Sequence, residues 1–473
     1  MYRSIGTSLR KRLWLLASLI SLALVSSSLG QSGVSPALRS NIDDIARKVL
    51  ATTGVPSASL AIVEDGRIAY LQAYGDARLD PHLPANPAMR YSIGSISKQF
   101  TAAAILMLAE EGKLSLDDPV SKYVSGLSRG NEVTIRQLLS HTSGYQDYWP
   151  QDYVMPMMLK PVTPEEILDR WARIPLDFDP GTKWQYSNTN YVIAGVIVEK
   201  VSGMPLWTLL GKRVFTPLGM NRVTDTNDKA LPESDPGAYF RYALGPLHPA
   251  PKEGRGWMFA AGELAMTAED LAKWDISIVN RTVLMPASYK EMETAVLLNN
   301  GAPTRYGLGV GVSIVSGHRM LEHSGEVSGF TAENIVLPDD KMAIVVLTNQ
   351  DAAAAASEIG GQIRSALLKS ENPQDQKEDD KIRKVYDGLQ QGKIDRSLFT
   401  DNANFYFNDQ ALKDYAGSLG PLGVPQSFTP SGTSLRGGMT ERIYEVKYPT
   451  KNLGIIIYEM PDGRLEQYLI AER

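Results

Sequence analysis

The chain has 473 residues, more than one ordinary domain holds and enough for two or three. Hydrophobic residues make up 43% of it and charged residues 21%, which is typical of a folded soluble protein. The formal net charge of −5 gives a nucleic-acid partner no electrostatic support, so none is expected. The chain has no cysteine, which excludes disulfides, thiolate chemistry and cysteine-bound metals.

Residues 1–30 have the pattern of a secretory signal peptide. Basic residues precede an apolar run from Leu13 to Val25, and small residues follow as far as Gly30. A membrane anchor is the alternative, but this run is short for the roughly 20 residues that a membrane span needs. We therefore expect cleavage near Gly30, export to the periplasm or the extracellular space, and no membrane span in the mature chain.

A domain of alternating strands and helices is expected at residues 35–368. Apolar runs at 58–63 and 67–71, separated by an acidic turn, predict a β-hairpin. A helix is expected to begin near Ser95, and residues 100–109 are apolar on all sides, so this helix should be buried. Strand patterns return at 307–315, 332–337 and 342–348, before a closing helix at 352–368. Strands at both ends of a helical middle suggest one sheet to which both ends contribute.

Composition changes at residues 369–380, which are polar and charged, as expected of a linker. Beyond it, residues 381–473 predict a small α+β domain with one amphipathic helix and alternating strands. The helix carries Ile382, Val385, Tyr386 and Leu389, and the strands are expected at 442–448, 453–460 and 465–470. This pattern resembles the cone-shaped domains of the nuclear-transport-factor-2-like (NTF2-like) type, with a small lipocalin-like barrel as the alternative. We expect the domain to cover an active-site mouth or to mediate self-association into a homo-oligomer.

Ser95 and Lys98 are three residues apart, which places both side chains on one face of the predicted helix. The spacing alone is weak, since Ser8 and Lys11 repeat it, and a helix cap beside a lysine that reaches solvent is the alternative. A lysine at the head of a buried helix loses hydration, which lowers its pKa toward the neutral, proton-accepting form. Lys98 is therefore a candidate general base for Ser95 as nucleophile.

Tyr186 and Asn188 lie in a predicted loop that enters an apolar helix. A tyrosine hydroxyl near a lysine can exist partly as phenolate and relay the proton of a serine. Asn188 offers two donors and one acceptor to a lysine or to a substrate amide. A buried tyrosine that bonds a loop carbonyl is the alternative, and Tyr406 and Asn408 show that the spacing arises easily.

The segment His323-Ser324-Gly325-Glu326 contains the only His-x-Gly of the chain. Glycine permits close approach of the backbone to a ligand, and the next N–H can point into an oxyanion hole. A histidine with a purely structural role is the alternative.

A rival nucleophile is Ser128, in a Gly-x-Ser-x-Gly match from Gly126 to Gly130. This pattern is typical of the nucleophile elbow of α/β-hydrolases, which needs a buried strand before it and a helix after it. The sequence on both sides of Ser128 is loop-like, so we interpret the match as chance.

The motifs Ser95-x-x-Lys98, Tyr186-x-Asn188 and His323-x-Gly325, in this order, resemble those of the serine β-lactamase and penicillin-binding-protein superfamily. The similarity is closer to the branch of class C β-lactamases, esterases and D-aminopeptidases, and it covers nearly all of residues 38–368. It extends to the segments Gly112–Pro119, Leu138–Gly144, Gly195–Gly203, Pro217–Met220 and Ala261–Thr267. The resemblance implies a β-lactamase/transpeptidase-like α/β (α+β) fold, in which helices flank an antiparallel sheet and an all-helical region is added.

The resemblance also implies roles for these residues. Ser95 would attack a carbonyl and become acylated, with Lys98 and Tyr186 sharing the acid and base roles. Backbone N–H groups of Ser95 and Glu326 would form the oxyanion hole. The expected substrate-binding and oxyanion positions are Asn188, His323, Ser324, Gly325 and Glu326. No metal or cofactor is required.

One departure from the family pattern bears on the substrate. His323 stands where β-lactamases have a lysine that attracts a substrate carboxylate, and histidine is mostly neutral near pH 7. Glu326 adds a negative charge beside it. The sequence therefore predicts an exported serine hydrolase that acts on an ester or an amide or peptide. A β-lactamase or D-Ala-D-Ala carboxypeptidase-type penicillin-binding enzyme is one alternative, and a non-catalytic binding protein of the same fold is another.

Overall fold

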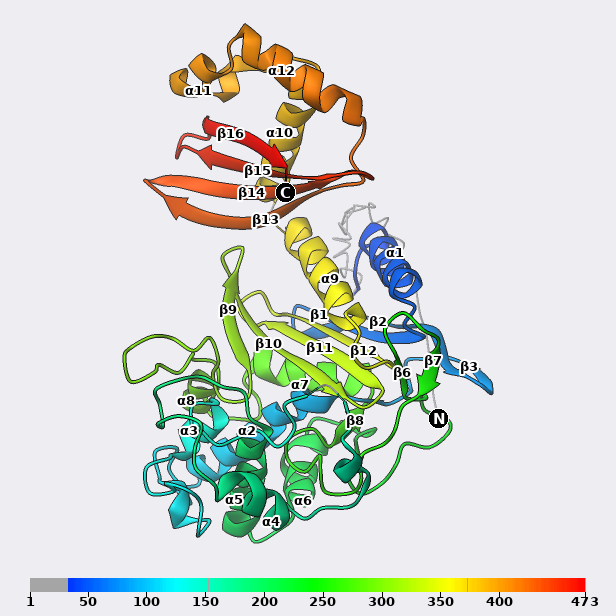
Figure 1. The fold of residues 1–473 in the computed structure, drawn as a ribbon, viewed down its shortest axis with the longest axis vertical. Helices are drawn as coiled ribbons and strands as arrows, with labels where there is room; N and C mark the ends of the chain where they lie inside the picture. Colours follow the sequence, from blue (N-terminus) through cyan, green and yellow to red (C-terminus); the bar gives the residue numbers. More distant parts are fainter. Residues whose placement is uncertain (1–32, 152, 372, 473) are drawn as a thin grey trace, which may run out of the picture.

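The computed structural model describes residues 33–151, 153–371 and 373–472, so the predicted signal peptide lies outside the described residues. A seven-stranded antiparallel sheet forms the centre of the larger domain, in the order β3-β2-β1-β12-β11-β10-β9 (Figure 1). Its strands are β1 (Ser57–Glu64), β2 (Arg67–Leu79), β3 (His82–Pro84), β9 (Gly311–Val315), β10 (His318–Val327), β11 (Phe330–Leu337) and β12 (Met342–Thr348).

The two ends of the domain meet in the middle of this sheet. Strand β1 pairs antiparallel with β12, and Leu60 lies opposite Val346. Both strands are buried almost throughout, since helices cover both faces of the sheet. The prediction of one sheet built from both ends is confirmed, as is the antiparallel fold that the family resemblance implied.

Helices α1 (Pro36–Thr53) and α9 (Ala355–Glu371) cover one face of the sheet (Figure 1). The sequence sets both ends of α1. The Ser35 hydroxyl accepts a hydrogen bond from the backbone N–H of Leu38 at 3.2 Å, and Pro36 occupies the first turn, where no N–H is needed. The helix ends at Gly54, whose φ of 72° suits a residue without a side chain.

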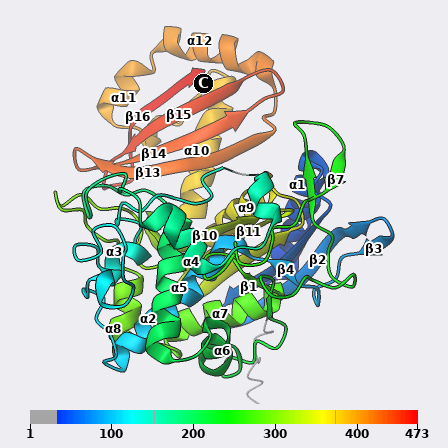
Figure 2. The same ribbon diagram turned by 60° about the horizontal axis from the view of Figure 1, so that its bottom comes forward.

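Helices α2 (Ser97–Glu110) and α7 (Ala268–Asn280) lie on the other face, and the helical region continues from them (Figure 2). The other helices of this region are α3 (Ile135–Leu139), α4 (Pro164–Ile167), α5 (Asn188–Ser202), α6 (Leu206–Leu210) and α8 (Pro286–Met292). The short strands are β4 (Tyr91–Ser92), β5 (Thr224–Asp225), β6 (Tyr239–Arg241), β7 (Leu247–Pro249) and β8 (Leu264–Met266). Within the described residues no single helix is long and apolar enough to cross a membrane, although α5 and residues 206–215, taken as a bent pair, pass by length and composition.

Helix α2 is buried from Ser97 to Leu108, as its sequence predicts. A short 3-10 turn, Gly94–Ile96, precedes it. Ser95 therefore lies in this turn, and Lys98 lies in the first turn of a helix with almost no contact with water.

Strand β10 was not predicted from the sequence, although it carries the His-x-Gly motif. Its polar residues and glycine do not alternate with apolar residues as a half-buried strand does. It forms because it has a partner on each side: Glu322 pairs with Gly311 of β9 and with Ile335 of β11. Long-range pairing of this kind overrides weak local propensity.

The C-terminal domain places three helices against a four-stranded antiparallel sheet (Figure 1). Its elements are α10 (Pro373–Gln390), α11 (Asp401–Tyr406), α12 (Asp409–Leu419), β13 (Ser427–Arg436), β14 (Met439–Lys447), β15 (Asn452–Glu459) and β16 (Leu465–Glu472). The four apolar residues predicted for its first helix, Ile382, Val385, Tyr386 and Leu389, are all buried in its core. The α+β architecture has the expected form, but β13, α11 and α12 were not predicted. The NTF2-like assignment stays a prediction.

Residues 369–380, expected to be a linker, are largely helical. They comprise the end of α9 and the beginning of α10. A charged sequence without apolar residues suits an exposed helix as well as an extended linker, because lysine, glutamate and glutamine are good helix formers. The domain boundaries themselves stay a prediction.

Candidate active site

Two glycines bring strand β10 against the turn that carries Ser95. Gly94 has a φ of 49°, and a Cβ there would lie 2.7 Å from the backbone nitrogen of Glu326. A Cβ on Gly325 would lie 1.9 Å from the carbonyl oxygen of Ile93. Larger side chains would push the strand away, so these glycines place the backbone of Glu326 beside the turn of Ser95. An oxyanion hole built from the N–H groups of Ser95 and Glu326 requires this arrangement.

Lys98 is fully buried, with 0% of its surface exposed, and its Nζ donates to three acceptors. These are Ser95 Oγ at 2.9 Å, Asn188 Oδ1 at 2.8 Å and the carbonyl oxygen of Ala261 at 2.8 Å. Burial lowers the pKa of Lys98 to about 7, while the charge of Asp147 acts in the opposite direction. Lys98 therefore exchanges its proton near neutral pH, as a general base must.

Asn188 connects Lys98 to a carboxylate that the sequence analysis did not single out. While Asn188 Oδ1 accepts from Lys98, Asn188 Nδ2 donates to Asp147 at 3.2 and 3.3 Å. The backbone N–H of Asn188 also donates to Asp147, at 2.9 Å. Burial raises the pKa of Asp147, and these hydrogen bonds and the charge of Lys98 lower it.

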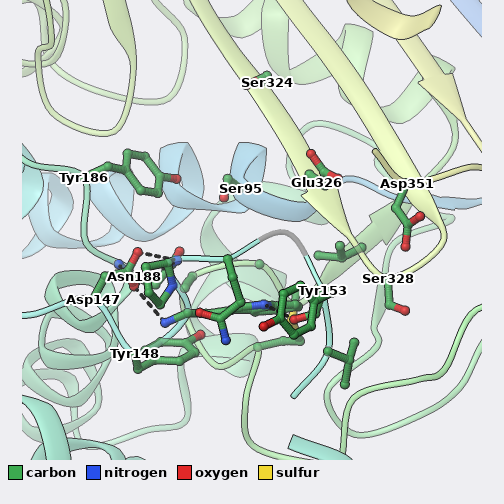
Figure 3. Close-up of a pocket in the computed structure, with 18 of the residues that line it drawn as sticks. Ser95, Asp147, Tyr148, Tyr153, Tyr186, Asn188, Ser324, Glu326, Ser328 and Asp351 are labelled. Atoms are coloured by element: carbon green, nitrogen blue, oxygen red, sulfur yellow. Dashed lines mark hydrogen bonds between the residues drawn. The ribbon is translucent and has the colours of Figure 1, made fainter. Parts of the chain in front are cut away.

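Tyr186 reaches toward Ser95 from the loop before α5 (Figure 3). Its hydroxyl is buried and has no hydrogen-bond partner of ordinary geometry among the described residues. Burial raises the pKa of Tyr186, while its contact with Ser95 lowers it. The phenol is therefore neutral near pH 7, so the partial phenolate expected from the sequence is wrong. A neutral hydroxyl beside Ser95 can still pass a proton onward.

His323 is held in one neutral tautomer. Its Nδ1 lies 2.6 Å from the carbonyl oxygen of Ser324, which can only accept, so Nδ1 carries the proton. Its Nε2 then accepts from the Tyr306 hydroxyl at 2.7 Å. Burial, followed by the charge of Lys98, lowers the pKa of His323 to about 4. His323 thus gives the site no positive charge near pH 7, as its sequence predicts.

A cavity of about 470 Å³ opens beside Ser95 (Figure 3). The predicted site residues that line it are Ser95, Tyr186, Asn188, His323, Ser324 and Glu326. Gly325 and Lys98 are not part of the lining: Gly325 packs within β10 against the backbone of Ile93, and Lys98 bonds Ser95. The three motifs, far apart in the sequence, therefore meet at one cavity.

The cavity is aromatic on one side and acidic in its charge. Tyr148, Trp149 and Tyr153 line it from the segment after α3. Its carboxylates are Asp147, Glu326 and Asp351, and no lysine or arginine is among the described residues that line it. A cavity of this charge attracts cationic groups and disfavours anionic ones.

Three residues that support the site were not predicted from the sequence. Asp147 and Tyr306 bond Asn188 and His323, as described above. His141 packs its ring against that of Tyr186, with centroids 4.2 Å apart, and its Nδ1 accepts from the backbone N–H of Ser187. His141 lies in a segment that resembles the family, but spacing within a sequence does not show which residues meet across loops.

The rival motifs lie elsewhere. Ser128 sits in a turn, and the residues before it form turns rather than a strand, so the elbow geometry is absent there. Asn408 caps α12, accepting from the backbone N–H of Ala411 at 3.0 Å. The interpretation of the Ser128 match as chance agrees with its position.

Comparison with known proteins gives the family. A family model described as Beta-lactamase matches residues 42–368, which is more than half of the chain. The chain belongs to the beta-lactamase family. The resemblance inferred from the three motifs is thereby confirmed, and membership identifies the chain as a serine hydrolase.

Three proteins illustrate the similarity. A penicillin-binding protein of Bacillus subtilis (strain 168) is 28% identical over 309 residues, covering 62% of this chain and 68% of that protein. A D-aminopeptidase of Cereibacter sphaeroides is 29% identical over 328 residues, covering 67% of this chain but only 61% of that protein. The structure of a D-stereospecific amidohydrolase from Streptomyces sp. matches with a TM-score of 0.59 at 28% identity, covering 67% of this chain and 96% of that one.

Proposed function

We propose that this protein is an exported amidase or peptidase whose substrates carry a free amino group close to the scissile bond. The observation that carries the proposal is the charge of the cavity, because three carboxylates and a neutral His323 line the same cavity as Ser95. A site for a substrate carboxylate needs a fixed cation, and a neutral histidine does not supply one. The names of two relatives, a D-aminopeptidase and a D-stereospecific amidohydrolase, support the same class.

The proposed reaction begins with neutral Lys98 taking the proton of Ser95 as its Oγ attacks the substrate carbonyl. The backbone N–H groups of Ser95 and Glu326 stabilise the oxyanion. Tyr186 then passes a proton to the leaving amine, which departs and leaves an ester of Ser95. Water hydrolyses this ester, with Lys98 and Tyr186 in the reverse roles.

The alternative of β-lactamase or D-Ala-D-Ala carboxypeptidase activity requires a carboxylate-bearing substrate. Such a substrate would enter a cavity with Asp147, Glu326 and Asp351 in its wall and would meet no cation at His323. Like charges at a binding site weaken association, so we expect these substrates to be poor.

A substrate panel tests the proposal. The panel is alanine p-nitroanilide with a free amino group, its N-acetyl derivative, p-nitrophenyl acetate, a chromogenic cephalosporin and N-acetyl-D-Ala-D-Ala, with both enantiomers of the two alanine anilides. We expect kcat/KM for the free-amine anilide to exceed that of the N-acetyl derivative by about tenfold, corresponding to ~1.4 kcal/mol. Ser95→Ala should abolish every activity.

Two results would overturn the proposal. A higher kcat/KM for the N-acetyl derivative or for the carboxylate-bearing substrates would contradict the charge argument. No turnover of any substrate, together with no labelling of Ser95 by a fluorophosphonate, would favour the non-catalytic binding protein. Export and self-association into a homo-oligomer remain part of the proposal; the basic and apolar pattern of residues 1–30 supports the first.

A further inference from the structure

Asp147 belongs to none of the three motifs, yet its carboxylate is connected by hydrogen bonds through Asn188 to the pair of Ser95 and Lys98. We propose that Asp147 is a positioning residue, which holds the Asn188 amide in the one orientation that presents Oδ1 to Lys98. This proposal rests on the proposed function, because Lys98 is the base of the proposed reaction.

The hydrogen bonds fix the direction of the amide. Asn188 Oδ1 lies 2.8 Å from Lys98 Nζ, while Asn188 Nδ2 lies 3.2 and 3.3 Å from the two oxygens of Asp147. If the amide turned over, its oxygen would face a carboxylate and its NH₂ group would face an amine that is a donor when charged. Both contacts would then be repulsive, so the carboxylate selects one of two orientations that an isolated asparagine samples equally.

Asp147 is itself held in place. Its Oδ1 accepts from the backbone N–H of Trp149 at 3.1 Å and from that of Asn188 at 2.9 Å. These bonds connect the segment after α3 to the first residue of α5. A change at residue 147 therefore acts on the amide of Asn188 through a fixed framework rather than through a mobile side chain.

The charge of Asp147 also acts on Lys98. The titratable groups around Lys98 from the elements packed against it are Tyr186, Tyr191, His141 and His323, besides Asp147. Burial raises the pKa of both tyrosines and lowers that of both histidines, so all four are neutral near pH 7. Asp147 is thus the group among the described residues whose charge raises the pKa of Lys98 against the effect of burial.

The test is Asp147→Asn, measured with p-nitrophenyl acetate across a pH range. This ester has no amino group, so any effect arises in the catalytic machinery and not in recognition of substrate charge. We expect kcat to fall about 10- to 100-fold through loss of alignment. We also expect the midpoint of the kcat/KM profile to move to lower pH, because Lys98 loses a favourable negative charge. Asp179→Asn, which removes an exposed carboxylate paired with Arg129, is the matched control and should change neither quantity.

A double-mutant cycle with Asn188→Ala separates positioning from other roles. If Asp147 acts through Asn188, then Asp147→Asn should cost little further kcat in the Asn188→Ala background. A fully additive loss would overturn the proposal. So would an unchanged kcat and midpoint on the ester together with a raised KM for the free-amine anilide alone, because Asp147 would then bind substrate directly.

Asp147→Glu is the second variant, for which we expect a reduced kcat with the midpoint retained, because the charge stays but its position changes. If Asp147→Asn does not fold, as judged by its circular dichroism melt, Asp147→Glu becomes the test. A lower kcat with an unchanged midpoint of the kcat/KM profile then supports the proposal, and an unchanged kcat overturns it. A wild-type enzyme that cleaves the ester but no free-amine amide would refute the proposed substrate class and leave the Asp147 test intact.

Discussion

The pKa of Lys98 leads to a quantitative prediction for the pH dependence of acylation. Burial of the amine lowers this pKa to about 7, against the opposing charge of Asp147. The neutral, proton-accepting fraction of Lys98 should then rise from about 9% at pH 6 to about 91% at pH 8. We therefore expect kcat/KM to rise about tenfold over this range and to level off above it.

Two competing assignments give different profiles. A lysine with an ordinary pKa of about 10.4 would give a rise of about 100-fold between pH 6 and 8, with no levelling. If His323 were the titrating group, its pKa of about 4 would leave the profile flat over the same range. The shape of the curve therefore identifies the base without a substitution.

The measurement is kcat/KM for an uncharged p-nitrophenyl ester from pH 5 to 9 at constant ionic strength, because this ratio reports the pKa values of the free enzyme. The rate of labelling by a neutral fluorophosphonate should follow the same curve, since it reports acylation alone. His323→Asn should retain the midpoint. A flat profile, or a rise that continues without levelling as far as pH 9, would refute the assignment of Lys98 as a base whose pKa burial has lowered.

Three further predictions concern the turn of Ser95, a buried carboxyl and the C-terminal domain. Gly94→Ala should lower kcat about 10²- to 10³-fold, because its Cβ would lie 2.7 Å from the backbone nitrogen of Glu326 in the oxyanion hole. Gly112→Ala is the control, since Gly112 also has a positive φ but lies in open space, and it should lower stability without lowering kcat. Equal kcat values for the two variants would contradict the argument. Burial, then the charge of a nearby aspartate, raises the pKa of Glu263 well above its usual value, so the free energy of unfolding should fall as pH rises from about 4.5 toward the folded-state pKa. Glu263→Gln should flatten this decline when the free energy of unfolding is measured by urea denaturation at a series of pH values. An unchanged dependence of that free energy on pH in the variant would contradict the prediction. Truncation after Glu371 should leave ester kcat/KM unchanged, because no described cavity residue lies in the C-terminal domain, whereas size-exclusion chromatography will show whether self-association is lost.

The sequence was sufficient to place the candidate nucleophile Ser95 beside a buried lysine, because this signal is local. Ser95 and Lys98 precede a run that is apolar on every side, so burial of the lysine follows from the sequence itself. Tyr186 was found by its motif, but its protonation state was predicted incorrectly. The sequence shows a nearby lysine, whereas the structure shows a buried hydroxyl whose pKa is raised, and burial outweighs the neighbour.

What the sequence did not show depends on contacts between distant segments. Strand β10 forms through its pairing with β9 and β11, and its own residues do not alternate as those of a strand usually do. Asp147 and Asn188 form a hydrogen bond although they are 41 residues apart in the sequence, and Tyr306 and His323 do so although they are 17 residues apart. Neither separation corresponds to a helical or strand period, so no pattern in the sequence predicts these pairs.

The hydrogen bond from Tyr306 to His323 has a consequence for the evolution of substrate choice in this site. Because burial and the charge of Lys98 lower the pKa of His323 to about 4, a change of pH does not turn His323 into a cation until that value is reached. Replacement of His323 by lysine alone would bury an ammonium opposite a hydroxyl and beside Lys98, at a cost of several kcal/mol without a paired carboxylate. Recognition of a substrate carboxylate would therefore require several coordinated changes, to His323, to Tyr306 and to the acidic residues of the cavity wall. The proposed preference for cationic over anionic substrates is in this sense a property of the whole site and not of the third motif alone.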